Sequence, residues 1–104
     1  MDLFLLRHAI AEQRDPTKYP DDALRPLTEK GIKRMRRVAE GFLAAGLTFD
    51  VIYTSPYTRA KQTADIVADV FGLRKVLRET DTLAVDGNPE ALIAELKKID
   101  ATSI

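Results

Sequence analysis

Residues 3–9 read LFLLRHA, and this stretch decides the fold class. Its first four residues, Leu3–Leu6, form a continuous apolar run of strand length. Continuous runs, rather than alternating ones, are typical of strands that a parallel sheet buries on both faces. We therefore predict a buried strand over residues 3–6, with Arg7 and His8 following at its carboxyl end.

A helix is predicted from residue 28 to residue 45. Thr28 can cap its first turn, where Glu29 also favours the positive end of the helix dipole. Gly46 suits the left-handed residue that commonly follows a helix. Apolar residues recur at helical spacing and predict the buried face, which comprises Ile32, Met35, Ala39, Phe42 and Leu43.

The remaining chain repeats this alternation of strand and helix. A second buried strand is predicted over residues 50–54, followed by a helix that Ser55 caps, Pro56 opens and Gly72 ends. Residues 75–78 form a third, short strand in this prediction, and Asn88 caps a third helix. Such alternation indicates an α/β fold with a mainly parallel sheet flanked by helices.

The composition limits the functions open to the chain. Its 104 residues suffice for one domain, and 45% of them are apolar and 31% charged, as in ordinary globular proteins. Sixteen basic and sixteen acidic residues leave no net charge to attract nucleic acid or an anionic membrane. The absence of cysteine excludes disulfides, thiolate catalysis and cysteine-bound zinc. With one histidine and no carboxylate cluster at ligand spacing, we expect no metal.

The start of the chain does not read as an export signal. Asp2 stands where such a signal has a basic region, and Arg7 interrupts the apolar run. No stretch approaches the roughly 20 apolar residues that a membrane helix needs. We therefore expect a cytoplasmic protein without a membrane partner.

Residues 10–27 show no helical or strand period and contain Pro16, Pro20 and Pro26. Loops of this length are uncommon inside compact domains and are often functional. Two interpretations stay open: a mobile, solvated connection, or a flap that faces the substrate.

Arg7, His8 and Arg59 are the candidate functional residues. In α/β sheets, ligands bind beyond the carboxyl ends of the strands, where both Arg7–His8 and the predicted helix start at residues 55–59 lie. A helix start favours anions, and arginine's planar fork matches phosphate oxygens. A neutral imidazole can attack phosphorus, and arginines beside His8 would disfavour its protonated form. The set predicts phosphoryl transfer without a metal, because the guanidinium groups supply the positive charge.

Three ordered motifs in the chain resemble those of the histidine phosphatase superfamily, which includes phosphoglycerate mutases and acid phosphatases. They are LLRHA at residues 5–9, RPLTEKG at residues 25–31 and SPYTRAKQTA at residues 55–64. The Arg-His-Ala form and the short connections are most similar to the bacterial SixA-type phosphohistidine phosphatases. The resemblance covers residue 1 to about residue 89 and, more loosely, the rest of the chain, and it implies a phosphoglycerate mutase-like fold.

The resemblance also implies roles for individual residues. His8 is the phosphate acceptor, and Arg7 and Arg59 bind the phosphate. Arg25 approaches the rim of the pocket from the long loop, and no cofactor is implied. Glu79 lies near the position of the acid in mutase-type members, but its surroundings do not match, so we interpret it as a surface residue.

One feature departs from the family pattern. Members carry a second histidine in a Gly-His motif after a later strand, whereas this sequence has only His8. The chain ends where the strand leading to that motif is expected to begin. We therefore expect residues 1–104 to be the N-terminal portion of a single histidine phosphatase domain.

Three hypotheses about function follow. The leading one is an enzyme that removes phosphate from phosphohistidine on a protein, such as a histidine phosphotransfer domain. The second is a phosphatase of small phosphoesters. The third, prompted by the single histidine, is a non-catalytic module that binds phosphate or a phosphoprotein. The sequence leaves open whether the 104 residues are active on their own.

Overall fold

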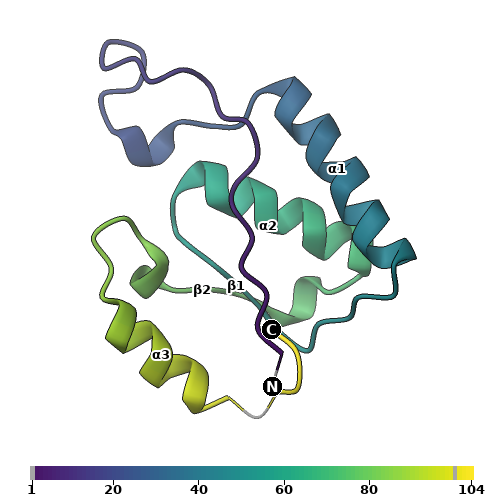
Figure 1. The fold of residues 1–104 in the computed structure, drawn as a ribbon. Helices are drawn as coiled ribbons and strands as arrows, with labels where there is room; N and C mark the ends of the chain where they lie inside the picture. Colours follow the sequence, from purple (N-terminus) through teal and green to yellow (C-terminus); the bar gives the residue numbers. More distant parts are fainter. Residues whose placement is uncertain (1, 100) are drawn as a thin grey trace.

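Helices and short strands alternate along the chain in the computed structural model, which describes residues 2–99 and 101–104 (Figure 1). The two strands pair in parallel, with Ile52 opposite Leu77, and α2 connects them. This arrangement confirms an α/β fold with a parallel sheet flanked by helices. The elements are η1 (Asp22–Leu24), α1 (Glu29–Ala44), β1 (Ile52–Thr54), α2 (Thr58–Phe71), η2 (Arg74–Val76), β2 (Leu77–Glu79), η3 (Asp81–Leu83) and α3 (Pro89–Lys97), where η marks a 3-10 helix.

Helix α1 begins and ends as predicted. The Thr28 hydroxyl accepts a hydrogen bond from the Gly31 amide, 2.9 Å away, and so caps the first turn. Gly46 has a φ of +85°, and the Leu47 amide donates to the Phe42 carbonyl, which closes the helix in a Schellman motif. Gly31 permits a close approach, because a Cβ there would lie 2.2 Å from the Ile10 carbonyl oxygen.

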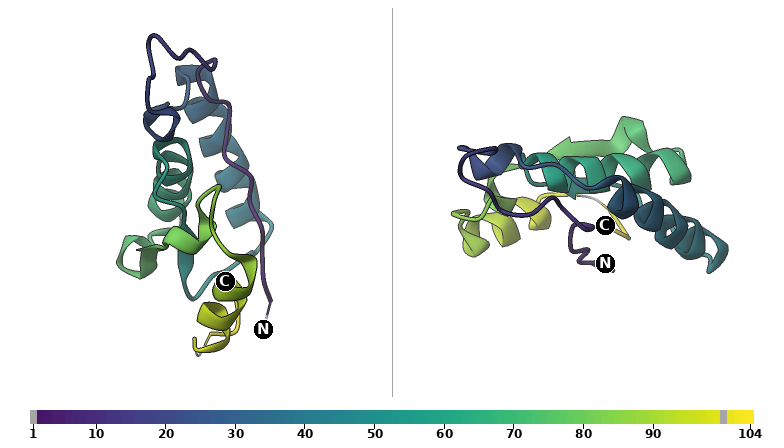
Figure 2. Two further views of the ribbon diagram at one scale, coloured as in Figure 1. Left: turned by 90° about the vertical axis from the view of Figure 1, so that its left-hand side faces the viewer. Right: turned by 90° about the horizontal axis from the view of Figure 1, so that it is seen from above.

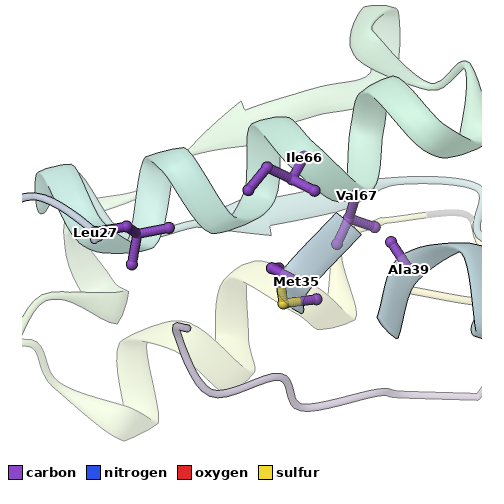
Figure 3. Close-up of a cluster of buried hydrophobic side chains, with 5 residues drawn as sticks. All are labelled: Leu27, Met35, Ala39, Ile66 and Val67. Carbon is purple, nitrogen blue, oxygen red and sulfur yellow. The ribbon is translucent and has the colours of Figure 1, made fainter. Parts of the chain in front are cut away.

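The hydrophobic core lies between α1 and α2 (Figure 3). Its buried members come from the end of the long loop, from α1 and from α2, and are Leu27, Met35, Ala39, Ile66 and Val67. The Phe49 ring contacts those of Phe4 and Phe71, with centroids 5.3 and 5.1 Å away. Leu43, predicted for the buried face of α1, is instead 47% exposed. The core is therefore thin, and the molecule is flat, with extents of 43 × 32 × 19 Å (Figure 2).

The predicted start of α2 was wrong by two residues. The Ser55 hydroxyl accepts from the Tyr57 amide and so forms a turn before the helix, which begins at Thr58. Tyr57 occupies the capping position and supplies no side-chain hydrogen bond to the first turn. The helix ends as predicted at Gly72, which has a φ of +69°.

The third predicted strand, residues 75–78, corresponds to β2, which starts two residues later than predicted. Residues 74–76 turn as η2 while the chain leaves α2, so pairing with β1 begins only at Leu77. The predicted cap of the third helix is confirmed, since the Asn88 side chain accepts from the amides of Glu90 and Ala91.

The largest correction concerns residues 3–6, which were predicted to form a buried strand. Within the described part of the chain they are extended and exposed, and Leu5 is 85% accessible to solvent. Only the start of this segment has a backbone partner. The Phe4 amide donates to the Ile104 carbonyl, and Asp2 forms a parallel bridge with Ser103. A strand needs a hydrogen-bonded neighbour, and the pairing stops at Phe4.

Residues 102–104 lie between two other segments of the chain. They pair with residues 2–4 on one side, and the Asp50 amide donates to the Ser103 carbonyl on the other. Neighbouring strands are about 4.8 Å apart, so the interval between residues 2–4 and Asp50 is one strand wide. Both chain ends lie together at this point (Figure 1).

An open, largely apolar groove of about 650 Å³ continues from this point, and we call it the central groove. It is lined by the extended segment at residues 3–8, by β1 with its flanking residues, by the first half of α2, and by Leu92, Leu96 and Ile104, among others. The exposed leucines at residues 3, 5 and 6 face this groove rather than a packed sheet.

Asp50 fastens residues 102–103, so Asp50→Ala is expected to weaken the fold. One carboxylate oxygen, Oδ2, accepts from the Thr102 hydroxyl, the Thr102 amide and the Ser103 amide. These hydrogen bonds, with that of the hydroxyl foremost, lower the pKa of Asp50 below its ordinary value of 3.8. The stabilisation is therefore complete above that ordinary value and is lost as the pH falls through the lowered pKa.

The measurement is the urea midpoint of unfolding, followed by circular dichroism at neutral pH and at pH about 2. Asp50→Ala should have a lower midpoint than wild type at neutral pH, and the difference should shrink at acid pH. Asp86→Ala removes an exposed carboxylate elsewhere and serves as the matched control. An equal difference at both pH values would contradict this account of Asp50.

Candidate active site

Charged and polar side chains gather at one end of the central groove. Arg7 and His8 come from the end of the extended segment, Ser55 and Tyr57 from the turn before α2, and Arg59 from the first turn of α2. The three candidate residues Arg7, His8 and Arg59 thus line the same groove, although Arg59 is more than 50 positions from the other two in the sequence.

The ring of His8 is exposed and makes one hydrogen bond that defines its tautomer. Its Nδ1 lies 2.8 Å from the backbone carbonyl oxygen of Ala9. A carbonyl oxygen only accepts, so Nδ1 must carry the proton for this bond to form. In the neutral ring, Nε2 then holds the free lone pair. This arrangement leaves Nε2 as the atom able to attack an electrophile.

Thr63 connects the histidine segment to α2, a role that the sequence did not reveal. Its hydroxyl accepts from the Ala9 amide, 3.1 Å away, and donates to the Arg59 carbonyl, 2.8 Å away. The residue is only 4% exposed. At helical spacing Thr63 shares a face of α2 with Ala60, Ala64 and Val67, so its only distinguishing sign in the sequence is a hydroxyl among apolar residues.

The guanidinium of Arg59 is nearly buried, with 9% of its side chain exposed. Its Nη2 lies 3.2 Å from the Asp22 carboxylate oxygen Oδ2, and its Nη1 donates to the Asp22 carbonyl at 2.9 Å. Its Cζ lies 5.0 Å from the centroid of the Tyr57 ring. The hydrogen bond from Arg25 and then the charges of Arg25, Arg59 and Arg14 lower the pKa of Asp22, so it is a carboxylate at neutral pH.

Arg25 was expected at the rim of the pocket, but it contacts the loop instead. Its Nε donates to Asp22 at 2.9 Å and its Nη1 donates to the Glu12 carbonyl at 2.6 Å. It is not among the residues that line the central groove. Arg25 therefore fastens the loop internally and reaches the site only through Asp22.

The loop at residues 10–27 is closed by backbone and side-chain contacts. Ala11 and Leu27 form an antiparallel bridge, and the Leu27 amide donates to the Gln62 side chain at 2.7 Å. The Thr28 amide donates to the Ile10 carbonyl. These bonds hold the ends of the loop against α2 and place η1 beside Arg59.

Other candidate groups lie away from the groove. Glu79 is on the surface, where its carboxylate lies 3.2 Å from the Lys61 ammonium. The described residues contain no group of three or more histidine and carboxylate side chains able to hold a metal ion. No helix in the described chain is long and apolar enough to cross a membrane.

In a comparison with protein families, residues 3–102 match the model of the histidine phosphatase superfamily (branch 1). An uncharacterised protein of Picosynechococcus is 47% identical over 68 residues, which are 65% of this chain and 40% of that protein. A 2,3-bisphosphoglycerate-dependent phosphoglycerate mutase of Bradyrhizobium diazoefficiens is 33% identical over 99 residues, 95% of this chain and 47% of the mutase.

Among solved structures, the chain is similar to the protein histidine phosphatase SixA in complex with tungstate. The TM-score is 0.82 at 26% sequence identity, and the match covers 94% of this chain and 60% of SixA. This likeness supports the phosphoglycerate mutase-like fold expected from the sequence. The chain spans less than half the length of the two curated relatives described above.

Replacement of Arg59 by alanine is expected to weaken the binding of small oxyanions. Removing charge-assisted hydrogen bonds costs about 1.5–3 kcal/mol, or roughly a 10- to 150-fold loss of affinity. Calorimetric titration with sulfate measures this loss. Arg59→Lys keeps the charge without the planar fork and should fall between wild type and alanine.

Arg78→Ala, which removes an exposed arginine from β2, is the matched control and should bind sulfate like wild type. Unchanged sulfate affinity in a folded Arg59→Ala protein would show that Arg59 does not serve as an anion ligand.

Proposed function

The chain belongs to the histidine phosphatase superfamily (branch 1), and from this premise we propose that it acts in removing phosphate from phosphohistidine on a protein. The nucleophile in this proposal is His8, and Arg7 and Arg59 bind the phosphate. The observation that carries the proposal is the geometry of His8. Its ring lines the same groove as both arginines, and its Nδ1 hydrogen bond leaves Nε2 free for attack.

The proposed reaction has two steps. In the first, Nε2 of His8 forms a bond to phosphorus while the bond between phosphorus and the substrate imidazole breaks, and that imidazole leaves with a proton from solvent. In the second, water attacks the phosphorus on His8, releases inorganic phosphate and restores the free imidazole. The guanidinium groups stabilise the charge on the equatorial oxygens in both steps.

A phosphohistidine substrate suits the groups that line the groove. A protonated imidazole is a good leaving group and needs little help from a general acid. Glu79 is paired with Lys61 on the surface, which agrees with a reaction that does not depend on it. A histidine phosphotransfer domain would present its phosphohistidine on an exposed surface, and the groove is open enough to receive one.

We also propose that residues 1–104 act as the N-terminal portion of a single histidine phosphatase domain. Two observations support this: more than half of each of the two curated relatives described above lies outside the match, and the central groove is one strand wide where residues 102–104 enter it. A further parallel strand in the groove would give residues 5–8 the backbone partners that they lack among the described residues.

Two other functions have specific support. A phosphatase of small phosphoesters is favoured by the similarity to a phosphoglycerate mutase, whose name describes a small phosphorylated substrate. A non-catalytic phosphate-binding module is favoured by the presence of one histidine in the sequence. The first differs from our proposal in the substrate and the second in turnover, so one assay separates all three.

The assay follows the release of phosphate from a radiolabelled histidine phosphotransfer domain, beside a panel of sugar phosphates and nucleotides. Wild type should release phosphate from the protein faster than from the panel. His8→Ala should fall to the rate without enzyme, because no other group in the chain supplies an imidazole. Arg78→Ala, remote from the groove, should act like wild type.

The other outcomes are equally informative. Preference for a sugar phosphate or nucleotide would support the small-substrate alternative. Binding of the labelled domain without release would support the non-catalytic module. Release that His8→Ala leaves unchanged would overturn the role of His8.

A further inference from the structure

Asp22 contacts Arg59 at two points, from a loop that the sequence did not connect with the site. Its carboxylate oxygen Oδ2 lies 3.2 Å from Nη2, and its backbone carbonyl accepts from Nη1 at 2.9 Å. Both contacts fall on the end of the guanidinium that is formed by the two Nη atoms. Asp22 therefore holds Arg59 end-on.

We propose that Asp22 is a positioning residue that fixes Arg59 end-on and so presents the side edge of the guanidinium, formed by Nε and Nη2, to the phosphate. This inference rests on the proposed function, in which Arg59 binds phosphate. It adds a residue to the site and specifies which donors of Arg59 serve the ligand.

The donor count supports this division of the guanidinium. The group has five N–H donors in a rigid plane. Nη1 donates to the Asp22 carbonyl, and the Asp22 carboxylate forms an ion pair with Nη2 at 3.2 Å. Nε–H and one Nη2–H point in parallel along the side edge, which is the geometry that matches two phosphate oxygens. A guanidinium that is already oriented loses less conformational entropy when the anion binds.

The surroundings of Arg59 restrict its movement. The side chain is 9% exposed, and its guanidinium carbon Cζ lies over the Tyr57 ring. Asp22 contacts the end of the guanidinium that is formed by the two Nη atoms. Because Arg59 also lies in the first turn of α2, its backbone is held by the helix, so Asp22 determines the orientation of the free end.

Asp22 does not neutralise the site, because three arginines share its charge. Oδ1 accepts from Arg25 at 2.9 Å and lies 3.7 Å from Nε of Arg14. The cluster that Asp22 forms with Arg14, Arg25 and Arg59 therefore holds one negative and three positive charges. The same contacts fasten η1 to α2, so the loop and the site are held by one side chain.

The opposite role predicts the opposite result. If Asp22 merely occupied Arg59 until phosphate displaced it, removing its charge would strengthen anion binding. If Asp22 positions Arg59, removing its charge weakens binding. The sign of the change therefore separates the two roles.

The test compares Asp22→Asn with Asp21→Asn in the full chain, with orthovanadate as the probe. Asp21→Asn makes the same change in charge one residue away and keeps the cap of η1, since asparagine caps as well as aspartate. Asp22→Asn should bind orthovanadate about tenfold more weakly than wild type, as is typical when a supporting residue of a site is changed. Asp21→Asn should bind like wild type.

A double-mutant cycle with Arg59→Ala distinguishes the positioning of Arg59 from a general structural role of Asp22. In the Arg59→Ala background, Asp22→Asn should change orthovanadate affinity less than about twofold, because Asp22 acts through Arg59. Equal losses in both backgrounds, or an affinity that rises or stays unchanged in Asp22→Asn, would overturn the positioning role.

A measurement on the wild-type chain covers the case in which a variant fails to fold. Titration with inorganic phosphate should shift the Arg59 Nε–H signal in a nitrogen-15 NMR spectrum, because the side edge receives the anion. A saturating titration that leaves this signal in place would overturn the inference. If Arg59→Ala itself leaves orthovanadate affinity unchanged, the proposed function fails; if only Asp22→Asn does so, the fault lies with Asp22 alone.

Discussion

The hydrogen bond from the Ala9 amide to the Thr63 hydroxyl fixes the position of the candidate nucleophile. The segment at residues 3–8 is extended and exposed, so packing alone does not hold it. Thr63 in turn donates to the Arg59 carbonyl, so one buried hydroxyl joins the residue after His8 to the residue that carries the guanidinium. The distance between His8 and Arg59 therefore depends on α2, which has more buried residues than α1.

The central groove begins where the backbone pairing of the amino-terminal segment ends. Residues 2–4 and Asp50 are bridged by residues 102–104, and beyond that point the leucines of the amino-terminal segment face open space. The fold is consequently supported on one side by the core between α1 and α2 and is open on the other. His8 lines the open groove and its ring is exposed, so it can be reached from solvent.

The sequence predicted features whose causes are local. The caps at Thr28 and Asn88 and the left-handed Gly46 follow from neighbouring residues and appear as expected. The prediction of a strand at residues 3–6 was wrong, because strand pairing depends on a partner that is distant in the sequence. Ser55 was misjudged because Ser-Pro begins turns as readily as helices. Asp22 and Thr63 escaped notice because their significance lies in contacts 37 and 54 positions away along the chain.

The central claim is that His8 is the phosphate acceptor, and one measurement tests it directly. The chain is incubated with phosphoramidate, a small phosphoryl donor, and peptides are then analysed by mass spectrometry. The account predicts one added phosphoryl group on the peptide that contains His8, lost in acid and stable in base, as a phosphohistidine is. A phosphoryl group on a serine or threonine, or none on His8 in a folded chain, would contradict it.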